Sequence, residues 1–232
     1  RQRVSLARCL VREPKVFLLD EPIAHLDAKL RHRLRRELKK WQEERGTTTL
    51  YTTTDYLEAF SVGDRIVVLN RGILEQMGTW EEIYTHPASH FVGMIVSDPP
   101  MNYLEARVVA RDTEIVLDVK GSLFKLPADV QAKIRAMNLQ EVIMGVFPSK
   151  IVPFAAETLP SSGTVIDGVV KFVELRGSRK IAFVSTDRNF TFTIQLSGEE
   201  SVRAGDRMRY FFGEEAIQVF DRQSQRNVIY LG

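Results

Sequence analysis

The segment from Val16 to Asp27, VFLLDEPIAHLD, constrains the fold of this chain more than any other. Its four leading apolar residues are typical of a strand buried in a parallel sheet, because such a strand is covered on both faces. The run ends in two adjacent carboxylates, Asp20 and Glu21. Polar residues that follow buried parallel strands gather at the carboxyl edge of the sheet, where ligands bind. The segment therefore predicts an α/β sheet with an acidic site at one strand end.

The two carboxylates suit a site that handles magnesium and water. In P-loop NTPases an Asp at the end of a buried strand helps to hold Mg²⁺, and a neighbouring acidic side chain can orient or deprotonate the attacking water. Asp20 is placed for the first role and Glu21 for the second. The residues alone leave another interpretation open, in which the pair is an ordinary strand end and Asp27 caps the following helix.

The other half of a nucleotide site is missing from this sequence. No Gly is followed by Lys in the 232 residues, so the phosphate-binding pattern G-x-x-x-x-G-K-[ST] does not occur. The chain also begins at Arg1, without an initiator Met or a signal-peptide core. We therefore interpret the chain as part of a longer protein.

Hydrophobic periodicity predicts an α/β order of elements in the first part of the chain. We expect helices over 1–11 and 28–45, the second ending at Gly46, and strands over 16–19 and 47–53. A strand, a helix and a strand in this order form a crossover between parallel strands. The expected elements that follow are a short helix opened by a capping box of Asp55 and Glu58, a hairpin at the sheet edge over 65–77, and two helices over 80–84 and 87–96.

The pattern changes at Ser97-Asp98-Pro99-Pro100, where two prolines stop any helix. From Glu105 onward short strands alternate with turn residues up to a last strand over 227–231, and only 128–137 looks helical. So many closely spaced strands predict one or two small Greek-key barrels of the OB type. We expect an α/β domain over 1–96, a linker over 97–104 and an all-β barrel domain over 105–232.

The charge of the chain is concentrated near its start. The net charge is only +2, but the helix expected over 28–45 carries eight Lys or Arg and three Glu around one apolar stripe. No aromatic pattern or helix-turn-helix partner accompanies this helix, so we interpret it as a solvated face and expect no nucleic-acid partner. The single cysteine, Cys9, excludes an internal disulfide and suits a reducing compartment.

Longer stretches resemble one family. The stretch RQRVSLARCLVREPKVFLLDEPIAHLDAKLR resembles the helix, Walker B strand and D-loop that follow the signature motif in ABC-transporter ATPases. DRIVVLNRG, GTWEEIY, HPASHFV and PPMN resemble the sugar-importer branch that includes maltose and glycerol-3-phosphate ATPases. Near the end, EVIMGVFPSKI and GDRMRYFF resemble the TOBE-type regulatory barrels of those subunits. The resemblance covers effectively the whole chain.

The resemblance implies roles for individual residues. Asp20 would hold Mg²⁺ through water, Glu21 would act as the catalytic base, and Asp27 would be the D-loop residue at a dimer interface. The implied cofactors of the intact protein are ATP and Mg²⁺, and none is expected for this chain alone. The implied partners are transmembrane permease subunits, a second ATPase subunit and, indirectly, a solute-binding protein, at the cytoplasmic face of the membrane.

The sequence departs from the family at Thr54. The family has a histidine at the third position of the segment that here reads Thr52-Thr53-Thr54-Asp55. Threonine is shorter than histidine and cannot carry a positive charge, so we expect an impaired hydrolytic site. The alternative is that Thr54 bridges through water and the site still turns over slowly. TTTD together with SDPPMN resembles one of the two unequal ATPases of glycerol-type importers, which would work as a heterodimer.

A second functional interpretation is not enzymatic. In it, the barrels from Glu105 onward form a dimerisation and regulatory module of such a transporter. Oxyanion binding by these barrels is a related option, but the turns at 177–180 and 197–198 show no spacing diagnostic of an anion site.

Overall fold

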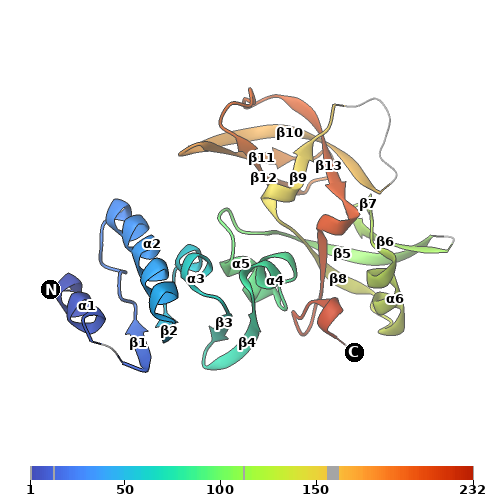
Figure 1. The fold of residues 1–232 in the computed structure, drawn as a ribbon. Helices are drawn as coiled ribbons and strands as arrows, with labels where there is room; N and C mark the ends of the chain where they lie inside the picture. The colour runs from blue at the N-terminus through green and yellow to red at the C-terminus, as the bar shows by residue number, and fades with distance from the viewer. Residues whose placement is uncertain (1, 13, 112, 156–161, 232) are drawn as a thin grey trace. The chain divides into compact units, whose positions relative to one another are not determined.

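A computed structural model of the chain describes residues 2–12, 14–111, 113–155 and 162–231 (Figure 1). The chain divides by its contacts into two compact units, Arg1–Thr85 and His86–Gly232, called unit 1 and unit 2 below. Each unit has its own strands and its own core, so each is described by itself.

Unit 1 alternates helices and strands. Its elements are α1 (Gln2–Leu10), β1 (Val16–Asp20), α2 (Ala28–Arg45), β2 (Thr48–Thr52), α3 (Tyr56–Val62), β3 (Ile66–Asn70), β4 (Ile73–Gly78) and α4 (Trp80–Thr85). β1 and β2 pair in parallel, with Val16 beside Thr48 and Asp20 beside Thr52. The predicted order of strand, helix and parallel strand is confirmed.

The crossover helix α2 begins and ends at residues that the sequence identifies. The Asp27 carboxylate caps its first turn by accepting a hydrogen bond from Leu30 N at 2.9 Å. Gly46 closes it in the left-handed conformation, with φ of 59°, and donates its N–H to Gln42 O. Between these ends Trp41 meets Phe17 of β1 edge to face, with ring centroids 4.7 Å apart. Local signals and one apolar stripe therefore suffice to place α2 on the sheet.

Only one face of β1 and β2 is covered in the part of the chain that the structure describes. Phe17 and Leu19 are buried in the unit 1 core, which is completed by Leu6, Ile23 and Leu38. On the opposite face Val16, Leu18 and Leu50 are exposed by 51%, 73% and 63%. The four-residue apolar run predicts a strand that is covered on both faces, but the described residues pack against only one of them.

The hairpin of β3 and β4 is correctly predicted, but its place in the sheet is not. β1 and β2 form one two-stranded sheet, and β3 and β4 form another. The described residues provide no ladder of hydrogen bonds between the two pairs, so the hairpin is not an edge of the first sheet.

Unit 2 is mostly β. It opens with α5 (His90–Ile95) and contains one longer helix, α6 (Ala128–Ala136). Its strands are β5 (Asn102–Arg111), β6 (Glu114–Val119), β7 (Ser122–Lys125), β8 (Glu141–Val146), β9 (Ile151–Pro153), β10 (Gly163–Arg176), β11 (Arg179–Ser185), β12 (Thr191–Ser197), β13 (Arg207–Gly213) and β14 (Ile217–Asp221). They form two five-stranded antiparallel sheets, in the orders β12-β11-β10-β13-β9 and β14-β8-β5-β6-β7, around one shared apolar core (Figure 1). A mostly β second part is confirmed, and its assignment as an OB or TOBE barrel stays a prediction.

The last predicted strand, over 227–231, is wrong. The structure has a short 3-10 helix there, from Val228 to Tyr230. Asn227 is fully buried, and its side chain caps this helix by accepting a hydrogen bond from Ile229 N at 3.1 Å. The β-branched residues favour a strand, but the buried cap decides the local conformation.

The contacts also divide the chain earlier than the expected linker over 97–104. Residues 86–96 join unit 2, because Asn227 donates its backbone N–H to Ala88 O at 2.9 Å and Tyr103 donates its hydroxyl to His90 O at 2.8 Å. β5 already begins at Asn102, inside the expected linker. α5 ends at Ile95, before the two prolines, and hydrogen bonds between residues distant in sequence decide which unit residues 86–96 belong to.

Candidate functional site

The ends of β1 and β2 bring the predicted acidic site together with the second strand. Asp20 is the last residue of β1, is exposed, and lies beside Thr52, the last residue of β2. Thr52 donates its hydroxyl to Asp20 Oδ1 over 2.6 Å. That distance is typical of a hydroxyl bonded to an ionised carboxylate, which is a strong hydrogen bond. The sequence analysis assigned Asp20 and overlooked Thr52, because strand register cannot be read from a single strand.

Glu21 continues from Asp20 in an unusual backbone conformation. Its φ is +40°, which places a residue with a side chain in the left-handed region. Its N–H is held by Thr52 O at 3.1 Å. A left-handed conformation costs a non-glycine residue about 1–2 kcal/mol and is found at functional sites more often than elsewhere. The chain therefore turns sharply at the strand end and holds Glu21 next to Asp20.

The strain at Glu21 gives a first testable prediction. Glu21→Gly should be more stable than Glu21→Ala by about 1 kcal/mol in urea unfolding, because both remove the carboxylate and only glycine relieves the positive φ. The matched control is the pair Glu37→Gly and Glu37→Ala. Glu37 is solvent-exposed and lies in the middle of α2, where glycine disfavours the helix, so the Gly variant should be less stable than the Ala variant by about 1 kcal/mol. The same sign at both positions would show that Glu21 is not strained.

Thr54 lies in a bend two residues beyond the end of β2. Along this segment Tyr51 and Thr53 are half-buried, whereas Thr52 and Thr54 are exposed. Thr52, at the end of the strand, is the residue that bonds to Asp20. The role of Thr54 at the predicted switch position stays a prediction.

A buried carboxylate fixes the loop that carries Thr54. Glu58 of α3 is only 2% exposed and accepts hydrogen bonds from the Tyr51 hydroxyl and, at 2.6 Å, from Thr53 Oγ1. Burial, together with the bond to Glu58, raises the pKa of Tyr51 well above its usual range, so the phenol remains a donor. The loop is therefore tied to α3 from its inner side while Thr54 faces outward.

The predicted capping box is half correct. Asp55 caps α3 by accepting hydrogen bonds from Leu57 N at 2.9 Å and Glu58 N at 3.2 Å. The Glu58 side chain does not complete the box, because it is occupied by Tyr51 and Thr53. The Asp55 N–H is satisfied by Thr53 Oγ1 at 3.1 Å instead. Glu58 is thus a residue that the sequence pattern identified and assigned to the wrong partner.

Asp27 is the N-cap of α2, as the structural interpretation of the acidic segment expects. A capping role is compatible with a second role at an interface, because the side chain is exposed in this chain. The role of Asp27 at a dimer interface stays a prediction.

The oxygen and nitrogen atoms near Asp20 show whether this residue could help to bind Mg²⁺. Among the described residues, no group of three or more His, Cys, Asp or Glu side chains could hold a metal ion. Mg²⁺ is commonly bound by one or two carboxylates, with waters and substrate phosphates completing its octahedral shell. The exposed Asp20 carboxylate at a strand end fits the protein share of such a shell.

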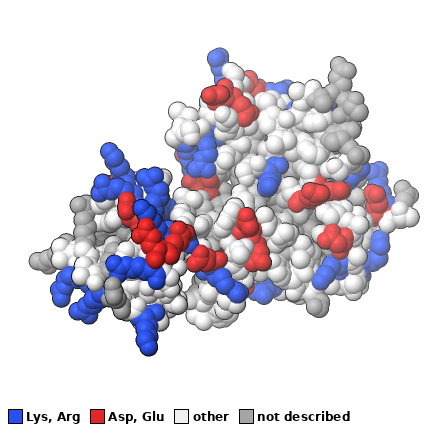
Figure 2. Space-filling view, in the orientation of Figure 1, with Lys and Arg blue, Asp and Glu red and all other residues white. Residues whose placement is uncertain are grey.

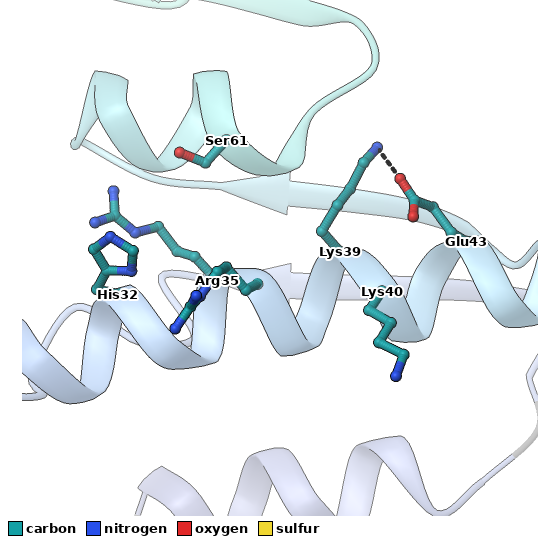
Figure 3. Close-up of a pocket in the computed structure, with 7 residues that line it drawn as sticks. His32, Arg35, Lys39, Lys40, Glu43 and Ser61 are labelled. Atoms are coloured by element: carbon teal, nitrogen blue, oxygen red, sulfur yellow. Dashed lines mark ion pairs between the residues drawn. The ribbon is translucent and has the colours of Figure 1, made fainter.

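The basic helix α2 forms no convergent site. Figure 2 shows Lys and Arg gathered with interspersed acidic side chains over unit 1. A shallow groove of about 260 Å³ between α2 and α3 is lined by His32, Arg35, Arg36, Lys39, Lys40, Glu43 and Ser61. In Figure 3 Lys39 turns toward Glu43 and Lys40 lies on the opposite side of the helix. Lys39 also pairs with Asp64 at 2.5 Å. Lys39 and Lys40 thus lie on different sides of α2, and each is paired with a carboxylate.

No helix among the described residues combines the length and apolar character that crossing a bilayer requires.

Comparison with known proteins gives a consistent set of relatives. The chain is 39% identical over 232 residues to the trehalose/maltose import ATP-binding protein MalK of Thermococcus litoralis, covering 98% of this chain and 61% of the relative. It is 36% identical to the sn-glycerol-3-phosphate import ATP-binding protein UgpC of Cupriavidus necator, covering 95% and 59%. It is 35% identical to the trehalose import ATP-binding protein SugC of Mycobacterium tuberculosis, covering 98% and 63%. The chain therefore spans less than two thirds of the length of these relatives.

Two other comparisons add little. No family model matches the chain. A solved structure of the cytoplasmic molybdate-binding protein ModG covers 51% of this chain and 94% of its own, at 14% identity and a TM-score of 0.41, and we draw no conclusion from it.

Proposed function

We propose that this chain is the C-terminal part of an ATP-binding subunit of a sugar or glycerol-3-phosphate importer, because it is 35–39% identical to such subunits over 95–98% of its length. The longer protein is called the full-length subunit below. The observation that carries the proposal is the parallel pair of β1 and β2, which holds Asp20 and Glu21 beside Thr52. This is the arrangement of strand ends that a phosphate-handling site uses.

The proposed activity is ATP hydrolysis with Mg²⁺. Asp20 would hold the ion through water, and the ion would neutralise charge on the phosphates. Glu21 would accept a proton from the attacking water, which then adds to the terminal phosphorus as ADP leaves. Thr54 would stand where a longer cationic side chain is needed, so we propose that hydrolysis at this site is slow. A more competent partner subunit in a heterodimer would then supply most of the turnover.

The names of the relatives, which are import ATP-binding proteins, support a role in transport. ATP would close a dimer of two ATPase subunits, with Asp27 at its interface, and the closure would be passed to transmembrane permease subunits at the cytoplasmic face of the membrane. A solute-binding protein would deliver the solute to the permease. The printed names of the relatives, which concern trehalose, maltose and sn-glycerol-3-phosphate, support a carbohydrate or polyol as the solute class.

The exposed face of β1 and β2 supports the proposal that more protein belongs on unit 1. Val16, Leu18 and Leu50 form a contiguous apolar surface on neighbouring strands. Strands of this composition in parallel sheets are normally covered on both faces. A segment that carries the missing phosphate-binding loop would supply both the cover and the remaining nucleotide contacts.

Calorimetry with ATP and Mg²⁺ tests the proposal. We expect no measurable heat of binding for the 232-residue chain and saturable binding for the full-length subunit, because the phosphates are held mainly by the loop that this chain lacks. Micromolar affinity in the 232-residue chain would contradict its description as an incomplete site. An absence of binding in the full-length subunit would contradict the ATPase proposal and leave the non-enzymatic regulatory module.

A further inference from the structure

Thr52 contacts both acidic residues of the site. Its hydroxyl donates to Asp20 Oδ1 at 2.6 Å, and its carbonyl accepts the Glu21 N–H at 3.1 Å. The Glu21 N–H also lies 3.4 Å from the Thr52 hydroxyl oxygen. Among the described residues, Thr52 is the one side chain that donates a hydrogen bond to the Asp20 carboxylate. One threonine thus links the end of β2 to the two residues proposed for magnesium and water.

We propose that Thr52 is a positioning residue for the magnesium site: its hydroxyl fixes the Asp20 carboxylate so that Oδ2 is left for a metal-bound water. The inference rests on the proposed function and deepens it. The role differs from that of a metal ligand, because the Thr52 hydroxyl is directed at Asp20 and acts through it.

The geometry supports such a role for three reasons. The strand register places Thr52 directly beside Asp20, so the hydroxyl reaches Oδ1 without distortion of either strand. A β-branched side chain in a strand is restricted in its first torsion, so the hydroxyl is held in place before any ligand binds. Asp20 is exposed at a strand end, where an unrestrained carboxylate would rotate freely. The Thr52 hydroxyl therefore restricts rotation of the Asp20 carboxylate before the metal binds, so less conformational entropy is lost on binding.

The size of the effect can be anticipated from other metal sites. Hydrogen bonds to a ligating carboxylate typically contribute 10–100-fold to metal affinity. The loss of the Thr52 hydroxyl should weaken the metal and leave the protein fold unchanged. Valine has the shape and strand preference of threonine without the hydroxyl.

The test is Mn²⁺ binding to the full-length subunit with ATP bound, followed by electron paramagnetic resonance. Thr52→Val should lower Mn²⁺ affinity about 10–100-fold, while ATP affinity without metal stays at the wild-type value. Thr52→Ser, which retains the hydroxyl, should bind Mn²⁺ close to the wild-type level. The matched control is Thr48→Val, an exposed threonine at the other end of β2, which lies beside Val16. This control should not change Mn²⁺ affinity.

The outcomes separate the inference from the function on which it rests. If wild type binds Mn²⁺ and Thr52→Val binds it equally or more tightly, the metal site is upheld and the positioning role of Thr52 is overturned. Equal losses in Thr52→Val and Thr48→Val would also overturn it, since they would report a general effect on β2. An absence of Mn²⁺ binding in wild type with ATP bound would overturn the proposed function together with the inference.

Discussion

Replacement of Thr54 by histidine in the full-length subunit is expected to raise its rate of ATP hydrolysis about 10²- to 10³-fold, the size of one transition-state hydrogen bond to a developing anion. An imidazole reaches farther than a threonine hydroxyl and can carry a positive charge. Thr54 is exposed in a bend two residues beyond the end of β2, so a larger side chain fits there without repacking the unit 1 core. Because Glu58 ties the loop from its inner side through Thr53, the substitution should leave the backbone in place.

Phosphate release at saturating ATP and Mg²⁺ measures this effect. The matched control is Thr191→His, which introduces the same side chain at an exposed threonine of β12 in unit 2 and should leave the rate unchanged. Thr54→Ala distinguishes the two interpretations of the native residue. A rate equal to wild type means that Thr54 contributes nothing, whereas a clear drop means that it bridges through water. A Thr54→His rate at the wild-type level, with ATP still bound, would refute the view that this position limits hydrolysis.

The sequence predicts those parts of unit 1 that depend on local signals. Asp27 and Gly46 delimit α2, and the apolar run before Asp20 delimits β1, because caps and periodicity act within a few residues. The Thr52 bond to Asp20 was not predictable in this way. It depends on the register between two strands separated by a helix, which a single sequence does not specify.

The errors in unit 2 have the same physical origin. The segment over 227–231 has the composition of a strand, but the buried Asn227 side chain caps a 3-10 helix there. The prolines at 99 and 100 mark a break in the chain, yet residues 86–96 belong with unit 2 through hydrogen bonds to its C-terminal segment. Asn227 is itself held by hydrogen bonds to Pro87 O and Gln218 Oε1, so in both cases contacts outside the segment outweigh its local signal.

Asn227→Ala is expected to lower the free energy of unfolding of unit 2 by about 3 kcal/mol, because it leaves several buried polar groups without partners. The Asn227 side chain is fully buried and donates to Pro87 O at 3.0 Å and to Gln218 Oε1 at 2.9 Å. It also accepts from Ile229 N at 3.1 Å. One side chain thus joins the start of unit 2, β14 and the C-terminal 3-10 helix, and no neighbouring group can replace all three bonds.

Urea unfolding of the 232-residue chain, followed by circular dichroism, measures the loss, and hydrogen exchange locates it. Since Pro87 O would lose its side-chain donor, amide protons in residues 86–96 should exchange faster in Asn227→Ala than in wild type. The matched control is Ser224→Ala, a nearby exposed residue whose hydroxyl bonds to Asp221 at 2.6 Å, and it should cost about 1 kcal/mol or less. Asn227→Asp keeps the acceptor and removes both donors, so it should destabilise unit 2 at least as much as Ala does near neutral pH. Equal stability of Asn227→Ala and Ser224→Ala would contradict the prediction, and would mean that the backbone bond from Asn227 to Ala88 and the Tyr103 bond to His90 hold residues 86–96 to unit 2 without the Asn227 side chain.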